Sequence, residues 1–158
     1  KNRDVVYSSD RKLPEGFEIR NYKASDFEAL ELFWNANGLG GSHRGDTAGI
    51  IEETLASGGH LLILTDGQGN LIGSSWLTND RRRTYLHHFG IAKLFRGRGF
   101  ADLLLEESLK LAFTDGLQIK IEVHRENEIA LNLYRKYGFK YLGDYDVYLI
   151  RELPVQEF

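Results

Sequence analysis

The sequence predicts one mixed α/β domain, of the kind also described as α+β, in which helices and strands alternate. Its 158 residues are enough for one globular unit with one core. Residues 61–91 are divided into short apolar runs by glycine-rich and polar turns, as expected of paired strands. Residues 98–114 instead carry apolar side chains at helical spacing. Together, these patterns predict a sheet that is flanked by helices.

The N-terminal part of the chain begins without a periodic pattern. Residues 1–14 end at a proline and are expected to form an extension, which leaves residues 15–158 as the domain itself. The first strand is predicted over residues 17–22. No apolar run approaches the roughly 20 residues that a membrane helix needs, so we expect a soluble, cytoplasmic protein with no membrane partner.

Two helices are predicted after this strand. Ser25 and Glu28 form a capping box, in which side chains satisfy backbone N–H groups at a helix start. The glycine-rich loop over residues 37–46 follows and is a candidate lid. A second helix is predicted over residues 47–56, where a pair of glycines ends it.

Three strands are predicted to come next in close succession. Residues 61–66 and 71–78 are separated by the sequence GQGN, whose glycines and asparagine suit a hairpin turn. The third strand covers residues 84–91 and follows the polar tip NDRRR. The simplest interpretation of these arginines is a solvated turn.

The C-terminal part begins with a helix over residues 98–114 and an alternating strand over residues 117–123. Asn127 can cap a short helix that ends at Gly138. The sequences KYLG and DVYLIREL then predict two last strands. The expected element order is therefore β-α-α-β-β-β-α-β-α-β-β.

Charge and residue types exclude several kinds of site. The net charge of −3 shows no basic excess, so we expect no nucleic-acid partner. The chain has no cysteine, which excludes disulfides, thiolate metal sites and a cysteine nucleophile. His87 and His88 are adjacent and would point to opposite faces of a regular strand, so they could not share a metal ion. We therefore expect no metal centre.

The sequence RGRGFA, which begins at Arg96, lies between a predicted strand and a helix. Gly97 and Gly99 allow a tight turn that directs N–H groups outward, and the helix dipole favours an anion there. Arg96 and Arg98 add charge that fits a pyrophosphate. The motif could instead be a loop without a ligand, in which the glycines only allow the turn. A second possible ligand is ATP.

This motif resembles the phosphate-binding motif of the GNAT N-acetyltransferase superfamily, Q/R-x-x-G-x-G/A, through Arg96, Gly99 and Ala101. A second segment resembles the family's pattern of an acidic strand residue followed by N-x-x-A-x-x-L-Y-x-x-x-G-F. Its matching residues are Glu122, Asn127, Ala130, Leu133, Tyr134, Gly138 and Phe139. Two motifs in the expected order are more specific than either alone. The resemblance covers residues 17–153 and implies a mixed, mainly antiparallel central sheet.

The resemblance also implies that the ligand is acetyl-CoA or a related acyl-CoA. Its pyrophosphate would lie over N–H groups at the helix start, and its pantetheine arm would pair with the preceding strand. The residues expected to bind it are Phe89, Gly90, Ile91, Arg96, Gly97, Arg98, Gly99, Phe100, Ala101, Asp102 and Asn127. Asn127 could equally serve only as an N-cap, and Gly90 could mark a bulge.

Transfer to an amine needs a neutral nitrogen and a proton for the departing thiolate. Tyr134 matches the position that the family commonly uses as general acid. Glu122, through an ordered water, is the expected general base, and His87 is its competitor because a histidine titrates near neutrality. Each residue also has a structural interpretation, since Tyr134 shares an apolar helix face and Glu122 can be a solvated surface group.

We therefore expect an acyl-CoA-dependent N-acyltransferase that transfers acetyl from acetyl-CoA to a primary amine by direct attack in a ternary complex. The alternative is a CoA-binding sensor or interaction module with the same fold. The acceptor, whether small molecule, amino acid or protein N-terminus, stays open, and so does a homodimer. Its pocket would be walled by the loop over residues 37–46, the hairpin near Trp76 and the final strands around Tyr145 and Tyr148.

Overall fold

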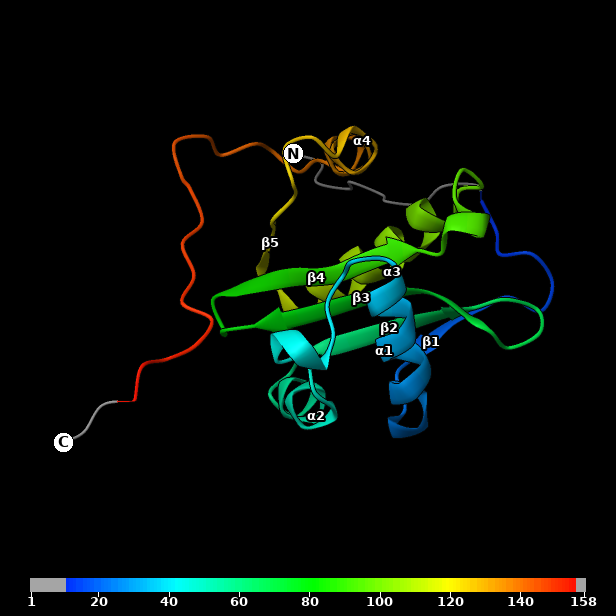
Figure 1. The fold of residues 1–158 in the computed structure, drawn as a ribbon. Coiled ribbons are helices and arrows are strands. Elements are labelled where there is room, and N and C mark those ends of the chain that lie inside the picture. Colours follow the sequence, from blue (N-terminus) through cyan, green and yellow to red (C-terminus); the bar gives the residue numbers. More distant parts are fainter. Residues whose placement is uncertain (1–10, 156–158) are drawn as a thin grey trace.

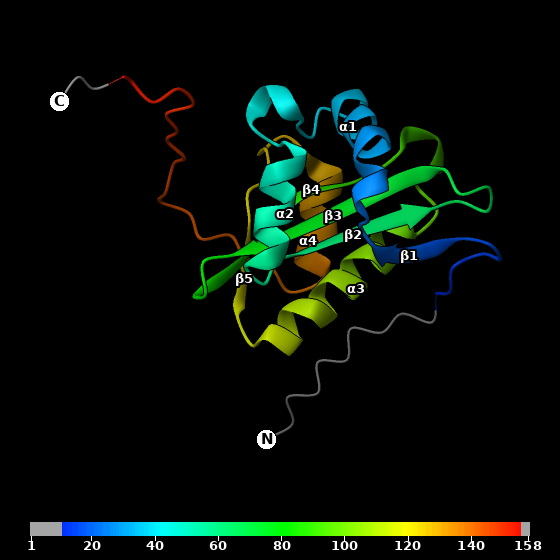
Figure 2. The same ribbon diagram turned by 90° about the horizontal axis from the view of Figure 1, so that it is seen from below.

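The computed structural model describes residues 11–155, and a five-stranded sheet runs through its centre. The helices and strands are β1 (Glu18–Asn21), α1 (Phe27–Ala36), α2 (Ala48–Ala56), β2 (His60–Thr65), β3 (Leu71–Asn79), β4 (Arg83–Ile91), α3 (Phe100–Asp115), β5 (Gln118–Ile121) and α4 (Glu128–Lys136). Helices α1 and α2 cover one face of the sheet, and α3 and α4 cover the other (Figure 1, Figure 2).

The strands lie side by side in the order in which the chain makes them, β1-β2-β3-β4-β5. Three of the pairs are antiparallel, and only β4 and β5 run parallel. A parallel pair needs a long crossover connection, which here is α3. The predicted mixed, mainly antiparallel sheet with flanking helices is thus confirmed.

The core lies on both faces of this sheet because β2 and β3 are apolar on both. Leu61 and Ile63 pack with the helices α1 and α2, whereas Leu62 and Leu64 pack toward α3. Such continuous apolar strands are typical of a sheet covered on two sides. A further cluster, which includes Leu105 and Tyr134, joins α3 to α4.

Local side chains adjust where the helices begin. Thr47, predicted as the first residue of the second helix, is instead the N-cap of α2 and accepts the N–H of Ile50 at 3.2 Å. The expected capping box between Ser25 and Glu28 does not form within residues 11–155. The Asp26 carboxylate instead accepts the N–H of Lys23 at 2.8 Å. Helix α3 begins later than predicted, because the residue before it has a left-handed conformation.

The two last predicted strands are not formed within residues 11–155, and this part of the prediction is wrong. The segment over residues 140–155, called here the C-terminal arm, has no helix or strand. It leaves the body beside β5 and runs outward (Figure 1, Figure 2). Its composition favours a strand, but a strand is stable only when an edge pairs with it, and the arm does not lie along an edge here.

An irregularity between β3 and β4 shapes the centre of the sheet. Trp76 pairs with His87 and Ser74 pairs with Gly90, so two residues of β4 lie opposite the single residue Ser75. This is a β-bulge with its extra residue in β4. His88, at the bulge, has a φ of 45°, a left-handed conformation that is uncommon for a residue with a side chain.

A buried chain of hydrogen bonds holds the bulge in place. The Trp34 indole N–H donates to the Ser74 hydroxyl at 2.9 Å, and this hydroxyl donates to the carbonyl oxygen of His88 at 2.7 Å. The Trp34 and Trp76 rings stack at 5.5 Å, and the His88 ring meets the Trp34 ring edge-on at 4.7 Å. Helix α1 therefore fixes the backbone of β4 through Ser74.

Replacing Ser74 tests whether its hydroxyl stabilises the bulge. We expect Ser74→Ala to lower the free energy of unfolding by about 1–3 kcal/mol, because the indole N–H and the His88 carbonyl both lose a buried partner. Urea unfolding of purified protein measures the change.

The matched control is Thr84→Val on the neighbouring strand. The Thr84 hydroxyl is also buried, but within residues 11–155 it has no hydrogen-bond partner. Its loss should leave stability unchanged or raise it. Equal losses in both variants would mean that the Ser74 hydrogen bonds do not support the bulge.

Candidate functional site

A tight turn leads from β4 into α3 and forms the first part of the site. After the 3₁₀ turn Lys93–Phe95, Gly97 has a φ of 77° and Gly99 a φ of 85°, both strained for other residues. Gly99 is the N-cap of α3, so no side chain from that position caps the helix. The first-turn N–H groups of this 16-residue helix, with its dipole, form a place for an anion.

The arginines of the turn do not all face the helix start. Arg96 donates to the carbonyl oxygen of Ile91 at 2.9 Å and to the side-chain oxygen of Asn37 at 3.0 Å. It thereby ties the turn to the end of β4 and to the loop after α1. Arg98 is exposed, and its guanidinium lies over the Phe95 ring at 5.3 Å. Their contact with a phosphate stays a prediction.

Arg11, which the sequence pattern did not single out, also lies at this turn. Its guanidinium contacts the backbone position of Gly99, where a Cβ would collide with it, and it pairs with Asp102 at 2.8 Å. Lys136 and the Tyr137 hydroxyl donate to the other Asp102 oxygen. A single arginine in a segment without periodicity gives no sequence signal for this arrangement.

Asp102 is therefore a junction between the N-terminal segment, α3 and α4. Desolvation opposes ionisation of this buried carboxylate, but the hydrogen bonds from Lys136 and Tyr137 outweigh it and hold its pKa below the usual value. Its side chain is thus occupied by protein groups. Only its backbone N–H remains a candidate contact for a ligand, which is the contact that the family resemblance implies.

The second part of the site is a gap between β4 and β5. The two strands pair only from Arg83 to Leu86 on β4, before the bulge. In the part of the chain that the structure describes, the rest of β4, residues 87–91, has a strand partner on the β3 side alone. Phe89, Gly90 and Ile91, the residues predicted to pair with an extended ligand, lie in this stretch. Gly90 also meets a packing need, since a Cβ there would lie 2.8 Å from Leu39.

The bulge brings His87 and His88 to the same face of the sheet, so the expectation that they face opposite ways is wrong. Both rings contact Trp76, at 6.0 Å and 5.3 Å. Phe89, which strict alternation would place on the face of His87, instead meets Tyr134 on the opposite face. The expectation assumed strict alternation, which an extra residue interrupts.

The surroundings of His87 favour its neutral form. Burial lowers the pKa of His87 and the neighbouring His88 lowers it further, while Glu122 and Asp46 oppose the shift through their negative charge. Its Nε2 lies 2.8 Å from the Thr78 hydroxyl. The structure thus brings Glu122, exposed directly after β5, within electrostatic range of His87.

His88 anchors the glycine-rich loop to the bulge. Its Nε2 lies 2.8 Å from a carboxylate oxygen of Asp46, which also accepts the N–H of Gly41 at 3.1 Å. A Cβ on Gly40 would collide with both of these side chains. The candidate lid is therefore tied to β4. This contact depends on the bulge, which places the His88 ring on the face of the sheet where the loop lies.

Tyr134 and Asn127 are placed by α4. Tyr134 is buried, with the rings of Phe89 and Phe139 at 5.9 Å and 5.4 Å. Burial raises the pKa of Tyr134 well above its usual value, so its hydroxyl stays protonated and can donate. Asn127 accepts the N–H of Ala130 at 3.2 Å, which confirms it as the N-cap.

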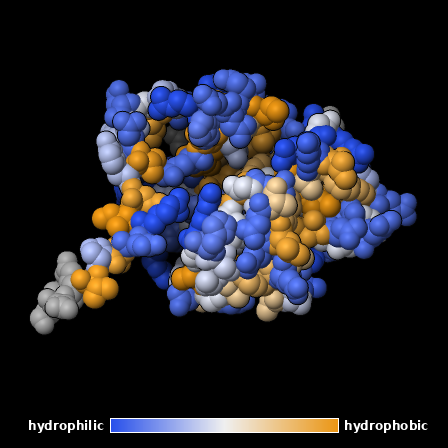
Figure 3. Space-filling view, viewed as in Figure 1, coloured by the Kyte–Doolittle hydropathy of each residue, from blue (hydrophilic) through white to orange (hydrophobic). Residues whose placement is uncertain are grey.

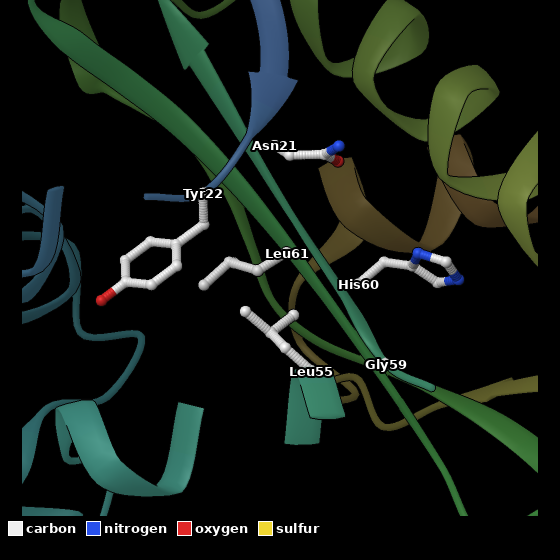
Figure 4. A pocket seen from close by; sticks show the side chains of 6 residues that line it. All are labelled: Asn21, Tyr22, Leu55, Gly59, His60 and Leu61. Carbon is white, nitrogen blue, oxygen red and sulfur yellow. The ribbon is translucent and has the colours of Figure 1, made fainter. Parts of the chain in front are cut away.

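A shallow pocket of about 210 Å³ lies elsewhere, beside α2 and the start of β2. Figure 4 shows Tyr22, Leu61 and Leu55 on one side of the strands, and Asn21 and His60 pointing to the other. None of its lining residues belongs to the site described above, so this pocket is not where we place the chemistry.

No helix within residues 11–155 is long and apolar enough to cross a membrane. In the same part of the chain, no three histidine, cysteine, aspartate or glutamate side chains are grouped so that they could hold a metal ion.

Known proteins resemble this chain in sequence and in fold. Acetyltransferase YE1169 of Yersinia enterocolitica is 29% identical over 124 residues, which cover 78% of this chain and 87% of that protein. A GNAT-family acetyltransferase from Staphylococcus aureus superposes with a TM-score of 0.71 at 20% identity, covering 82% of this chain and 89% of that one. The enzyme AAC(6')-Iy, in complex with the bisubstrate analogue CoA-S-monomethyl-acetylneamine, superposes with a TM-score of 0.68 at 19% identity, covering 85% and 98%.

The match to a protein-family model covers more of the chain than either sequence motif. The model of the Acetyltransferase (GNAT) family matches residues 27–139, from the start of α1 to just beyond α4. This match includes the gap at the bulge, the glycine turn and Tyr134. The chain that builds this site therefore belongs to the GNAT acetyltransferase family.

Proposed function

We propose that the protein is an acetyl-CoA-dependent N-acetyltransferase that acetylates a primary amine by direct attack in a ternary complex. One observation carries the proposal. The end of β4, which pairs with β3 but not with β5, leads through a 3₁₀ turn into the left-handed turn at the N-terminus of α3. An extended ligand that ends in phosphates matches both features, because the strand offers backbone pairing and the helix start offers N–H groups.

Acetyl-CoA has this shape and charge. Its pyrophosphate would rest on the N–H groups from Gly97 to Asp102, with Arg98 and Arg11 nearby to balance the charge. Its pantetheine arm would pair with residues 89–91 and bring the thioester to the bulge. AAC(6')-Iy, which shares the fold, was solved with an analogue that joins CoA to acetylneamine, and this supports an amine as acceptor.

The reaction then needs two proton transfers. The neutral amine attacks the thioester carbonyl, a C–N bond forms and the C–S bond breaks. Tyr134 donates its phenolic proton to the departing thiolate, consistent with a hydroxyl that burial keeps protonated. The chain has no cysteine, so a route through a cysteine thioester is excluded.

The proton that the amine gives up needs a base on the face of the bulge. We assign this role to Glu122 acting through a water, because it follows β5 and stays exposed. His87 is the alternative, supported by its neutral ring and its place on the bulged strand. The negative charge of Glu122 acts on the pKa of His87.

The competing function is a CoA-binding module without turnover. Both functions predict CoA binding, but only the enzyme releases free thiol when amines are added to acetyl-CoA. A panel of small amines, amino acids and peptide N-termini therefore separates the two and narrows the acceptor. Binding without thiol release across the panel would favour the module.

A charge placed in the glycine turn should weaken CoA binding. We expect Gly97→Asp to weaken it at least about tenfold, since like charges about 4 Å apart cost about 1 kcal/mol in water and more at a protein surface. The control is Gly69→Asp, because both glycines have a left-handed φ and no neighbour within 4 Å of an added Cβ. Calorimetry of both folded variants measures affinity, and equal affinities would contradict the proposed phosphate site.

Removing the Tyr134 hydroxyl should slow turnover without loss of CoA binding. We expect Tyr134→Phe to lower kcat by roughly 10²–10⁴, the range for one positioned proton donor. Tyr137→Phe is the control on the same helix. Its hydroxyl bonds Asp102 and Glu106, so its loss should affect stability rather than turnover. Normal turnover in Tyr134→Phe would make Tyr134 a core aromatic only.

The pH profile of kcat/KM distinguishes the two bases. If His87 is the base, its protonation removes activity as the pH falls through its pKa, which lies below the usual 6.5. That limb should vanish in His87→Gln and persist in Glu122→Gln. If Glu122 is the base, Glu122→Gln should cost roughly 10²–10⁴ in kcat/KM and His87→Gln less than about tenfold. Small losses in both would mean that neither side chain is the base.

A further inference from the structure

We propose that Arg11 closes over the glycine turn, so that the segment before β1 becomes part of the cofactor site. Asp102 holds the Arg11 guanidinium beside the turn, and the guanidinium bonds a pyrophosphate oxygen of the bound CoA. Binding of the cofactor and docking of the segment then stabilise each other. This inference rests on the proposed function, because it adds a contact to the same ligand.

The segment before β1 is packed on both sides of the turn. The Phe17 ring stacks on the Phe100 ring at 5.1 Å and meets the Phe95 ring edge-on at 6.1 Å. Phe95 precedes the turn, and Phe100 is the first residue of α3. Leu13 packs against the same cluster. Figure 3 shows apolar residues among hydrophilic ones at the right of the molecule, where Figure 1 draws this turn. These contacts fix where the segment crosses it.

Arg11 fills the space that a side chain at the N-cap of α3 would need. An added Cβ on Gly99 would collide with the Arg11 guanidinium, so this group lies against the backbone where the left-handed turn meets the helix. The Arg11 side chain is 49% exposed, and a ligand in solution can therefore reach it. Its charge stands beside the N–H groups that the proposed function assigns to the pyrophosphate.

Asp102 positions two cations at this place. Arg11 bonds one of its carboxylate oxygens at 2.8 Å, and Lys136 of α4 bonds the other. The Asp102 side chain is only 12% exposed, whereas that of Lys136 is 56% exposed. A shielded carboxylate thus holds two half-exposed cations next to the start of α3. A helix N-terminus favours anions, so a phosphate here would be stabilised by the dipole and by both cations together.

The Arg11 contact comes from outside both sequence motifs. The family model matches residues 27–139, and Arg11 precedes this stretch. A guanidinium carries its N–H donors in a planar fork, which suits the oxygens of a phosphate. The pyrophosphate would thus be held from two sides, by backbone N–H groups of the turn and by a side chain that lies 91 residues before Asp102.

Calorimetry with two ligands tests the contact. CoA and dephospho-CoA both carry the pyrophosphate, and only CoA carries the 3′-phosphate. We expect Arg11→Ala to weaken the binding of both by about 10–100-fold, which corresponds to one hydrogen bond to a charged group. Arg11→Lys, which keeps the charge without the fork, should recover part of this loss. Lys12→Ala is the control, since it removes the same charge from the exposed neighbouring residue and should bind both ligands as wild type does.

Three results would overturn the proposal. Wild-type affinity in a folded Arg11→Ala variant would mean that Arg11 only ties the segment to α3. Tighter binding of CoA in this variant would mean that the guanidinium occupies the place of the phosphate. A loss for CoA without a loss for dephospho-CoA would mean that Arg11 meets the 3′-phosphate and not the pyrophosphate.

A double-mutant cycle tests whether Asp102 positions Arg11. Asp102→Asn removes the charge that holds the guanidinium, so the loss of CoA affinity caused by Arg11→Ala should be smaller in the Asp102→Asn background than in wild type. Urea unfolding checks that all variants are folded. Losses that simply add would mean that the two residues act independently on the ligand.

Proteolysis tests the coupling from the side of the segment. Trypsin cleaves after Lys12, and mass spectrometry follows this cleavage in the intact chain. Because coupling between two binding events is reciprocal, CoA should slow the cleavage several-fold in wild type but not in Arg11→Ala. Faster cleavage with CoA would contradict the proposal, because the ligand would then displace the segment.

The same measurements separate this inference from the proposed function. A wild-type protein that binds no CoA would contradict both. A protein that binds CoA but releases no thiol with any amine would contradict only the proposed function. Equal CoA affinities in wild type and folded Arg11→Ala, together with normal turnover, would contradict only the role of Arg11.

Discussion

The hydrogen-bonded chain from Trp34 through Ser74 to the carbonyl oxygen of His88 is the constraint on which the site depends. A hydroxyl between an indole and a carbonyl satisfies three buried polar groups and fixes where β4 departs from regular pairing. The extra residue of the bulge follows directly on the last β4 residue that pairs with β5, Leu86. The position of the gap proposed for the thioester thus depends on buried hydrogen bonds in the core.

Two carboxylates attach a loop and the N-terminal segment to this frame. Asp46 joins the glycine-rich loop to His88, and Asp102 joins α3 to Arg11 and Lys136. Both carboxylates are well shielded and receive several donors, which makes their geometry more specific than that of an exposed ion pair. The two ends of the proposed ligand site are each braced by one acidic side chain.

Periodicity and turn residues predicted the nine helices and strands that the structure defines in residues 11–155, and the motifs pointed to the glycine turn and Tyr134. Periodicity could not predict the bulge, because one inserted residue leaves the apolar pattern of β4 unchanged while reversing which face His88 occupies. It also could not place the arm, since the same alternating residues suit a strand whether or not the chain itself supplies an edge. Arg11 was missed because contacts between distant segments leave no local pattern.

The sheet order has a consequence for how the molecule assembles. Because short turns join β2 to β3 and β3 to β4, the contacts among these three strands link nearby parts of the sequence, and hairpins of this kind form within microseconds. β5 can join only after α3 has crossed the sheet, which requires closure of a longer loop. A ribosome would thus release a nearly complete meander before β5 emerges, and the last strand to dock is the one that carries the free edge.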